Sequence, residues 1–94
     1  MTQNATGFLE LNNLASAIES ADQMLKAANL DFIKQIKIGS QSFVLLIKGD
    51  APSVEAALIA GEASAKRSGS FLVSQLVEDL DPAVERFIFQ EVLQ

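Results

Sequence analysis

The chain has 94 residues, a formal net charge of −5 at pH 7, and neither cysteine nor histidine. A chain of this length forms one domain with a modest hydrophobic core. The absence of cysteine excludes disulfides and thiol catalysis, and the absence of histidine excludes imidazole metal sites and histidine general bases. The acidic balance argues against a basic face that binds nucleic acid. We therefore expect no cofactor and no nucleic-acid partner.

Hydrophobic residues make up 49% of the sequence and charged residues only 20%. This is more apolar than a solitary small domain needs, so it predicts a further buried surface in an oligomer. No apolar run approaches the ~20 residues of a membrane-spanning helix, and residues 1–6 are polar and uncharged. We expect no signal peptide, no membrane association and a cytoplasmic location.

The first third of the chain predicts a strand followed by an amphipathic helix. Residues 6–11 read as a strand that is apolar on both faces near its middle. Either residue of Asn12-Asn13 can cap the helix that follows. Apolar residues then recur at helical spacing and form the expected core face: Leu14, Ala17, Ile18, Ala21, Leu25 and Ala28. The expected solvent face carries Ser16, Glu19, Ser20 and Gln23. Asp22 and Lys26 are spaced for an ion pair, and we expect Asn29 to close the helix in a left-handed conformation.

Two strands joined by a short polar turn follow this helix. Residues 31–38 predict a strand with one face wet or at an interface, and residues 43–48 predict a strand that is buried on both faces. Residues 39–42 form the turn, and we expect Gly39 to take the positive φ that a tight turn often requires. This turn is the best candidate for a functional surface, although it contains no catalytic group.

Residues 51–68 predict a second helix that is rich in small side chains. Asp50 is suited to cap it, and Pro52 falls within its first turn, where a missing N–H costs nothing. Its expected core stripe consists of Val54, Ala57, Leu58, Gly61 and Ala65. Residues 70–77 predict a fourth strand. Asp81-Pro82 then begins a short third helix, whose apolar stripe consists of Val84, Phe87, Ile88 and Val92.

This order of elements predicts an α+β fold of the ferredoxin-like type, a βαββαβ antiparallel sheet followed by a short C-terminal helix. Two similar halves span about residues 6–39 and 42–78. The expected strand order is fourth, first, third, second, with both long helices on one face of the sheet. The other face carries apolar residues, so it needs the third helix or a neighbouring subunit to cover it.

Several segments resemble the bacterial microcompartment shell family (BMC domain), of the single-domain, hexamer-forming type. The matching segments are Thr6-Gly7-Phe8-Leu9-Glu10, the helix from Ala17 to Asn29, Lys37-Ile38-Gly39-Ser40, Gly49-Asp50, Ala56-Ala57, Gly61 and Ala65-Lys66-Arg67. The resemblance covers about residues 5–78 without an evident gap, and its motifs are together specific. It implies one shell domain over residues 1–94, with residues 5–78 as the core and residues 79–94 as a C-terminal helical extension.

The resemblance implies a structural protein of a bacterial microcompartment shell, located in the cytoplasm, and not an enzyme. In the family, six copies form a flat cyclic hexamer, and hexamers tile with themselves or with paralogues around enclosed enzymes. The six turns meet at the sixfold axis and form a pore for small polar metabolites. The pore-lining residues implied for this chain are Gly39, Ser40 and Gln41. The residues implied for the hexamer edge are Lys26, Asn29 and Asp79.

Two positions depart from the family pattern. Members commonly have a second glycine after the pore serine, where this chain has Gln41. Six glutamines would narrow the pore, line it with amides, or lie back against the surface. Members typically have a proline and then an arginine where this chain has Glu78-Asp79. The reversed charge at Asp79 would weaken tiling between identical hexamers or favour pairing with a more basic paralogue.

Each candidate residue also has an ordinary structural interpretation. Ser40 is a common turn residue, Gln41 is an ordinary exposed side chain, and Lys26 forms a surface pair with Asp22. The alternative function is a small regulatory module of the same topology that holds a ligand between two to four subunits. An enzyme is the weakest interpretation, because the remaining Asp, Glu, Lys, Arg, Ser and Thr residues form no spaced constellation.

Overall fold

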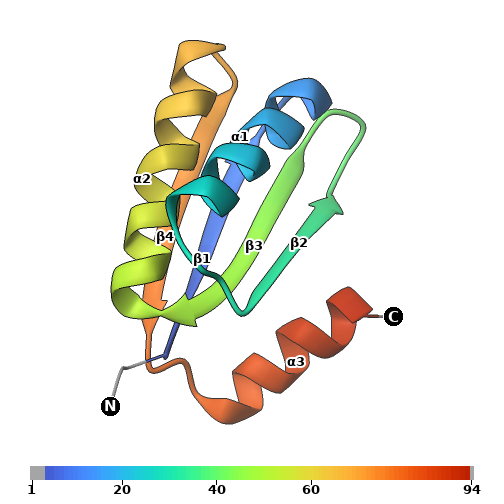
Figure 1. Cartoon of the computed structure of the whole chain (residues 1–94). Helices are drawn as coiled ribbons and strands as arrows, with labels where there is room; N and C mark the ends of the chain where they lie inside the picture. Colours follow the sequence, from blue (N-terminus) through green and yellow to red (C-terminus); the bar gives the residue numbers. More distant parts are fainter. Residues whose placement is uncertain (1–3, 94) are drawn as a thin grey trace.

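Four strands and three helices make up the part of the chain that the computed structural model describes, the backbone of residues 4–93 and the side chains of residues 4–87 (Figure 1). The elements are β1 (Asn4–Leu11), α1 (Leu14–Ala27), β2 (Phe32–Lys37), β3 (Phe43–Asp50), α2 (Ala51–Arg67), β4 (Phe71–Glu78) and α3 (Pro82–Leu93). The sheet order is β2-β3-β1-β4, and each neighbouring pair is antiparallel. The predicted ferredoxin-like α+β fold and its strand order are therefore confirmed.

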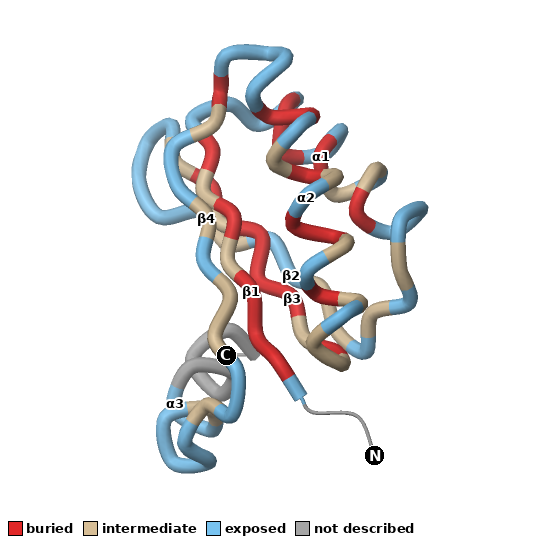
Figure 2. The backbone as a smooth tube through the Cα atoms, turned by 90° about the vertical axis from the view of Figure 1, so that its left-hand side faces the viewer, coloured by how far each residue is buried: buried red, intermediate tan, exposed pale blue. Residues whose placement is uncertain are grey.

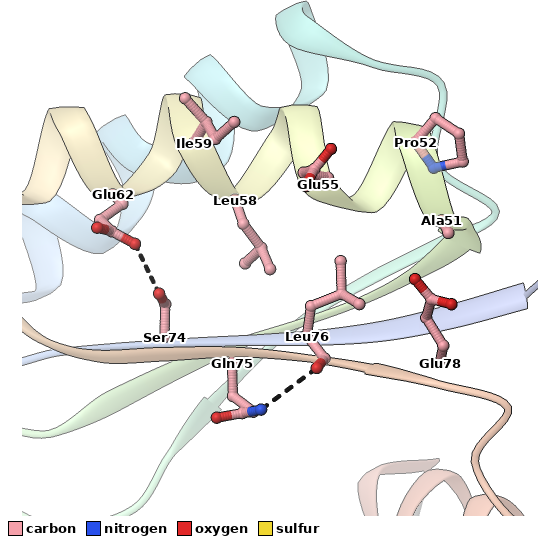
Figure 3. Close-up of a pocket in the computed structure, with 10 residues that line it drawn as sticks. All are labelled: Ala51, Pro52, Glu55, Leu58, Ile59, Glu62, Ser74, Gln75, Leu76 and Glu78. Atoms are coloured by element: carbon pink, nitrogen blue, oxygen red, sulfur yellow. Dashed lines mark hydrogen bonds between the residues drawn. The ribbon is translucent and has the colours of Figure 1, made fainter.

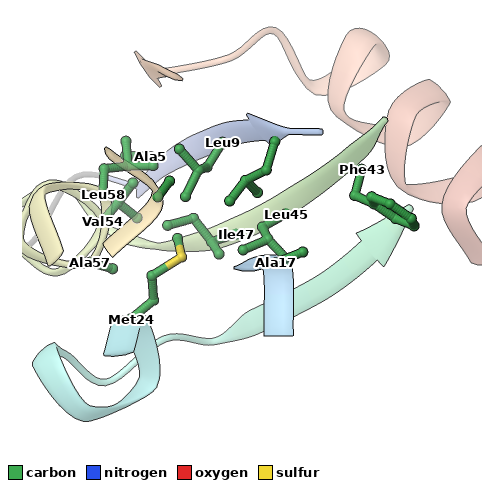
Figure 4. Close-up of a cluster of buried hydrophobic side chains, with 12 residues drawn as sticks. Ala5, Leu9, Ala17, Met24, Phe43, Leu45, Ile47, Val54, Ala57 and Leu58 are labelled. Carbon is green, nitrogen blue, oxygen red and sulfur yellow. The ribbon is translucent and has the colours of Figure 1, made fainter. Parts of the chain in front are cut away.

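Both long helices lie on one face of the sheet, and α3 lies on the other side (Figure 1, Figure 2). The core fills the space between the two helices and the sheet, where Leu9 and Ile47 of the central strands meet Met24 of α1 and Val54 of α2 (Figure 4). These four side chains are fully buried. Their removal from water is the main stabilising contribution in so small a domain.

The strand register divides the subunit into two ends. At the turn end, Lys37 pairs with Phe43, and Phe43 pairs with Leu11. At the far end, Asn4 pairs with Asp50. α1 runs from the turn end toward the far end, whereas α2 runs in the opposite direction (Figure 1). The loops at the two ends are therefore separated by the full length of the strands.

α2 begins and packs as the sequence predicts. The Ser53 N–H donates a hydrogen bond of 2.9 Å to Asp50 Oδ1, and Pro52 lies in the first turn. Every residue of the predicted core stripe is buried: Val54, Ala57, Leu58, Gly61 and Ala65. Gly69 follows the helix with a φ of 72°, which glycine adopts without steric cost, and it turns the chain into β4.

The start of α1 also forms as predicted. The Ser16 N–H donates to Asn13 Oδ1 (2.9 Å), so Asn13 is the N-cap. In the last turn of the helix, Lys26 Nζ lies 2.8 Å from a carboxylate oxygen of Asp22. This is the predicted ion pair, and because both side chains are more than half exposed it contributes little to stability.

The core face of α1 is not the predicted one. Leu14, Ile18 and Leu25 were expected in the core, but they are 47%, 59% and 53% exposed. Ser16 and Ser20 were expected in solvent, but they are buried. This prediction was wrong because hydrophobic periodicity identifies an apolar stripe without saying what covers it. The core side of α1 holds Ser16, Ala17, Ser20 and Met24, whereas its leucine and isoleucine side chains face outward.

Small side chains let α1 pack closely against α2, which is the physical reason for this rotation. The Ser20 hydroxyl donates to the Gly61 carbonyl oxygen across the helix pair (3.2 Å). The hydroxyls of Ser16, Ser68 and Ser70 lie within 3.2 Å of one another in a hydrogen-bonded triangle. This triangle joins the start of α1, the end of α2 and the start of β4. Because the buried hydroxyls are paired, their desolvation costs little.

The end of α1 also differs from the prediction. The helix ends at Ala27, and Ala28 is already extended, with a φ of −159°. Asn29 is therefore not a left-handed helix cap; within residues 4–93, the non-glycine residue with positive φ is Asp79, at 53°. The chain leaves α1 in an extended direction toward β2, so no left-handed residue is needed to reverse it.

The face of the sheet opposite α1 and α2 is only partly covered. By strand alternation and register, its half-buried apolar side chains are Phe8, Phe32, Ile36, Val44 and Val77. α3 lies near the far end of this face, where Glu85 and Lys48 form an ion pair of 3.0 Å. The Ala83 N–H donates to Asp81 Oδ1 (2.8 Å), so the predicted helix start at Asp81-Pro82 is confirmed.

Part of the predicted apolar stripe of α3 is exposed. Val84 and Phe87 both face solvent in the isolated subunit. Ile88 and Val92, the other two residues of that stripe, lie outside the residues whose side chains are described. Among the described residues, no helix combines the length and the apolar character needed to cross a lipid bilayer.

Candidate functional site

The turn between β2 and β3 stands exposed at the turn end of the subunit. It is closed by a backbone hydrogen bond of 2.9 Å from the Ile38 N–H to the Ser42 carbonyl oxygen. Gly39, Ser40 and Gln41, the three predicted pore residues, are all exposed at its tip. The structure thus brings these three residues together on a projecting loop that other molecules can reach.

Gly39 does not take the positive φ that was predicted for it. A Cβ built at this position would have the Ser42 Cβ as its nearest neighbour, at 3.9 Å, which is an ordinary van der Waals contact. Residues 38–42 share the reversal, so the chain turns without a left-handed residue. That prediction was wrong, and the backbone of this turn would accept a side chain at residue 39.

A shallow pocket of about 360 Å³ lies beside the turn. Its lining residues are Asn12, Asn13, Leu14, Lys37, Ser40, Gln41 and Phe43. The lining includes three carboxamides, one hydroxyl and one ammonium group, with no carboxylate. The turn end therefore offers hydrogen-bond donors and a single positive charge, a composition that suits small polar or anionic solutes.

The three predicted edge residues lie away from the turn. Lys26 is in the last turn of α1, and Asn29 follows in the loop at the far end, beside Gly49. Asp79 comes directly after β4, and its N–H donates to the Asn4 carbonyl oxygen (3.3 Å). Asn29 and Asp79 therefore share the far end of the subunit, opposite the turn (Figure 1).

A groove of about 490 Å³ between α2 and β4 was not predicted from the sequence (Figure 3). Its lining residues are Ala51, Pro52, Glu55, Leu58, Ile59, Glu62, Ser74, Gln75, Leu76 and Glu78. Leu58 and Leu76 point toward one another inside it, and Gln75 points to the other side of β4 (Figure 3). One signal in the sequence could have indicated it, because Ile59 falls outside the core stripe of α2.

Glu62 links α2 to the edge strand β4. Lys66 Nζ lies 2.8 Å from Glu62 Oε1, and the Ser74 hydroxyl donates to Glu62 Oε2 (2.6 Å). The hydrogen bond from Lys66, together with that from Ser74, lowers the pKa of the Glu62 carboxyl below its ordinary value. Lys66 also lies over the ring of Phe71, 5.0 Å from its centre. The charged Glu62 side chain thus connects α2 to β4.

The described residues contain no group of three acidic, histidine or cysteine side chains that could hold a metal ion. The features that the structure does place are an exposed loop, a polar pocket beside it, and a groove along an edge strand.

Comparison with known proteins identifies the family. A family model described as "BMC domain" matches residues 5–79 of the chain. The chain belongs to the BMC domain family. The resemblance found in the sequence is therefore confirmed, and the match includes the turn and most of the strands and helices that position it.

Relatives of this BMC-domain chain are named as shell proteins. It is 34% identical to the bacterial microcompartment shell protein PduA of Salmonella typhimurium over 94 residues, which cover both chains completely. It is 38% identical to the carboxysome shell protein CcmK2 of Thermosynechococcus vestitus over 67% of this chain and 62% of that protein. A solved microcompartments protein from Desulfitobacterium hafniense DCB superimposes with a TM-score of 0.79 at 31% identity.

That solved structure has a longer chain than this one. The BMC-domain chain matches it over 89% of its own length but spans only 46% of the other chain. The likeness therefore concerns the fold of one domain. The roles of the turn and of the far-end residues remain predictions.

Proposed function

We propose that this chain is a structural subunit of the shell of a bacterial microcompartment in the cytoplasm, and that it catalyses no reaction. The family membership and the shell proteins among its relatives support this role. The match to PduA over the complete length of both chains makes a single-domain subunit the simplest form. We take residues 5–78 as the shell core and residues 79–94 as a C-terminal helical extension.

Six copies assemble into a cyclic hexamer with the β2–β3 turn at the axis. Gly39, Ser40 and Gln41 then line a central pore. Backbone N–H groups, the Ser40 hydroxyl and the Gln41 carboxamide supply hydrogen bonds, and Lys37 adds a positive charge nearby. Converging donors of this kind favour small polar and anionic metabolites without a binding site that would trap them. Gln41, larger than a glycine, narrows the pore or lines it with amides.

The far end of each subunit then lies at the rim of the hexamer. Lys26, Asn29 and Asp79 form its lateral contacts with neighbouring shell hexamers or with paralogues. Asp79 places a negative charge at this rim, and six such charges on each of two identical hexamers repel one another. A paralogue with basic residues at its rim is therefore the better lateral partner. The enclosed enzymes are partners of the faces of the hexamer.

One observation carries this proposal: the exposed turn and the predicted rim residues occupy opposite ends of the subunit. In a closed ring, one end of each subunit lies at the axis and the other end lies at the rim. The test is the native mass in solution, with negative-stain images of the same sample. We expect a particle of six times 10.1 kDa with sixfold rings. A monomer, dimer or tetramer would contradict the shell role and favour the ligand-binding module.

A further inference from the structure

α3 is joined to the rest of the subunit through a residue in the left-handed conformation. Asp79 follows β4 directly and has a φ of 53°. Its N–H donates to the Asn4 carbonyl oxygen (3.3 Å), which fixes the end of β4 to the start of β1. The first helical residue of α3, Pro82, comes three residues later. Residues at the ends of elements absorb the backbone rotations that move whole elements, so Asp79 is placed to act as a hinge for α3.

Glu85 is the residue through which the described part of α3 contacts the sheet. Among residues 82–87, Glu85 is half-buried and the others are exposed, including Val84 at 44% and Phe87 at 67%. The Glu85 carboxylate lies 3.0 Å from Lys48 Nζ on β3, and each of these two side chains is 29% exposed. This half of α3 is therefore held to the sheet by an ion pair rather than by buried apolar surface.

The Lys48–Glu85 pair differs from the other two ion pairs in the described part of the chain. Each of those joins residues four apart on one helix, so its loss would leave the arrangement of the elements unchanged. Lys48 and Glu85 instead belong to different elements that are far apart in the sequence. Partial burial strengthens their attraction, but water still reaches both groups, so dissolved salt weakens it.

Lys48 lies in a row of side chains across the far end of the open sheet face. The register places Phe32, Lys48, Thr6 and Val77 beside one another on β2, β3, β1 and β4. By strand alternation, all four side chains point away from α1 and α2. Phe32 and Val77 are apolar and half-buried. Because Glu85 binds Lys48, α3 lies against this far-end row, and its departure would uncover the row.

We propose that the Lys48–Glu85 ion pair is a salt-sensitive attachment of α3, and that α3 rotates about Asp79 away from the sheet when this pair is broken. With the pair formed, α3 shields the far-end row. With the pair broken, the row is open to solvent and α3 loses its support. A helix of 12 residues is marginally stable alone in water, so α3 then partly unfolds. This device goes beyond the shell role and operates in a single subunit as well as in a ring.

Hydrogen exchange of the α3 amides, followed by mass spectrometry, tests the attachment in the full chain. Exchange at residues 82–93 should become roughly two- to fivefold faster in Glu85→Gln, as expected for the loss of one partly exposed ion pair. High sodium chloride should accelerate exchange in the natural chain but not in the variant. Exchanging the two charges, by Lys48→Glu with Glu85→Lys, should restore slow exchange. The matched control is Asp22→Asn, which removes an exposed pair on α1 and should leave α3 unchanged.

A thiol placed in the far-end row measures its exposure directly, because the natural chain contains no cysteine. The thiol of Val77→Cys should react faster with a soluble thiol reagent when Glu85→Gln is added. The control is Val73→Cys, on the same strand and face but nearer the turn end and already 51% exposed, and its rate should not change.

Three results would each overturn the attachment. They are equal α3 exchange in the natural chain and Glu85→Gln, fast exchange that persists after the charge exchange, and a Val77→Cys rate that does not respond to Glu85→Gln. None of these measurements depends on the number of subunits in the particle. A monomeric chain with a working attachment would therefore contradict the shell role alone.

Discussion

The Sδ atom of Met24 lies 2.7 Å from the position that a Cβ would take at Gly61. A Cδ atom of Leu9 lies 2.9 Å from the same position. These distances are shorter than van der Waals contact, so residue 61 must be glycine for α1 and α2 to pack at their present separation. The contact also brings the Gly61 carbonyl within reach of the Ser20 hydroxyl.

Gly61→Ala should therefore destabilise the fold, although glycine to alanine in an open helix position stabilises by about 1 kcal/mol. We expect a loss of about 1–3 kcal/mol in the free energy of unfolding, because the added methyl group forces Met24 and Leu9 to shift. Urea unfolding followed by circular dichroism measures it. The matched control is Gly39→Ala, which meets nothing closer than 3.9 Å. A Gly61→Ala protein more stable than the natural chain would contradict this packing.

Glu62 should make stability depend on pH. Hydrogen bonds from Lys66 and then Ser74 lower the pKa of its carboxyl in the folded state, so the unfolded chain binds the proton first as the pH falls. The contribution is complete above the unfolded pKa and is lost as the pH falls through the folded pKa. Unfolding measured from pH 7 downward should show the natural chain losing its advantage over Glu62→Gln. A difference in the free energy of unfolding that stays the same at low pH would contradict this stabilisation by Glu62.

Ser74→Ala should have an intermediate effect on the Glu62 carboxyl. It removes one of the two hydrogen bonds to Glu62 and leaves the bond from Lys66, so the pKa of Glu62 should rise only part of the way toward its ordinary value. Carbon NMR titration of the Glu62 carboxyl measures that pKa in the natural chain and in the variant. Identical titration curves would show that Ser74 does not stabilise the charged form.

Gln41→Gly should widen the proposed pore. Removing six carboxamides from the axis takes away both bulk and hydrogen-bond partners, so the conductance of hexamers in planar bilayers to small anions should rise. Asn29→Gly removes a carboxamide at the far end and should leave the conductance unchanged. Equal conductance for the natural chain and Gln41→Gly would mean that Gln41 lies back from the axis.

Asp79→Arg should promote two-dimensional sheets of this protein by itself, if the negative rim is what prevents tiling. Residue 79 has a φ of 53°, a conformation that aspartate and asparagine tolerate better than arginine. Asp79→Asn therefore removes the charge and keeps the conformation, and it should tile to an intermediate extent. Negative-stain images at matched concentrations compare the three proteins. Unchanged assembly in both variants would count against a role for this charge.

Much of the fold could be predicted because local signals agreed with the final packing. The cap at Asp50, Pro52 and the stripe from Val54 to Ala65 placed α2 correctly, and the two similar halves indicated the strand order. The turn at residues 39–42 was also found, because a short polar stretch between apolar strands has few other interpretations.

The core face of α1 could not be predicted from periodicity, because two surfaces compete for its apolar residues. Its inner side consists of Ser16, Ala17, Ser20 and the flexible Met24, which packs over Gly61 of α2, and the leucine and isoleucine side chains are left outside. The groove between α2 and β4 was missed for a related reason. It depends on how far an edge strand stands from a helix, which a sequence pattern does not encode.

The most direct test of the central claim is the distance between copies of one residue in the assembled particle. Nitroxide labels at Ser40→Cys and, in a separate sample, at Asn29→Cys can be compared by pulsed dipolar spectroscopy, since the chain has no other cysteine. We expect short distances between the six copies of residue 40 and much longer ones between copies of residue 29. Long distances at residue 40, or dipolar coupling absent from both samples, would contradict a hexamer with this turn at its axis.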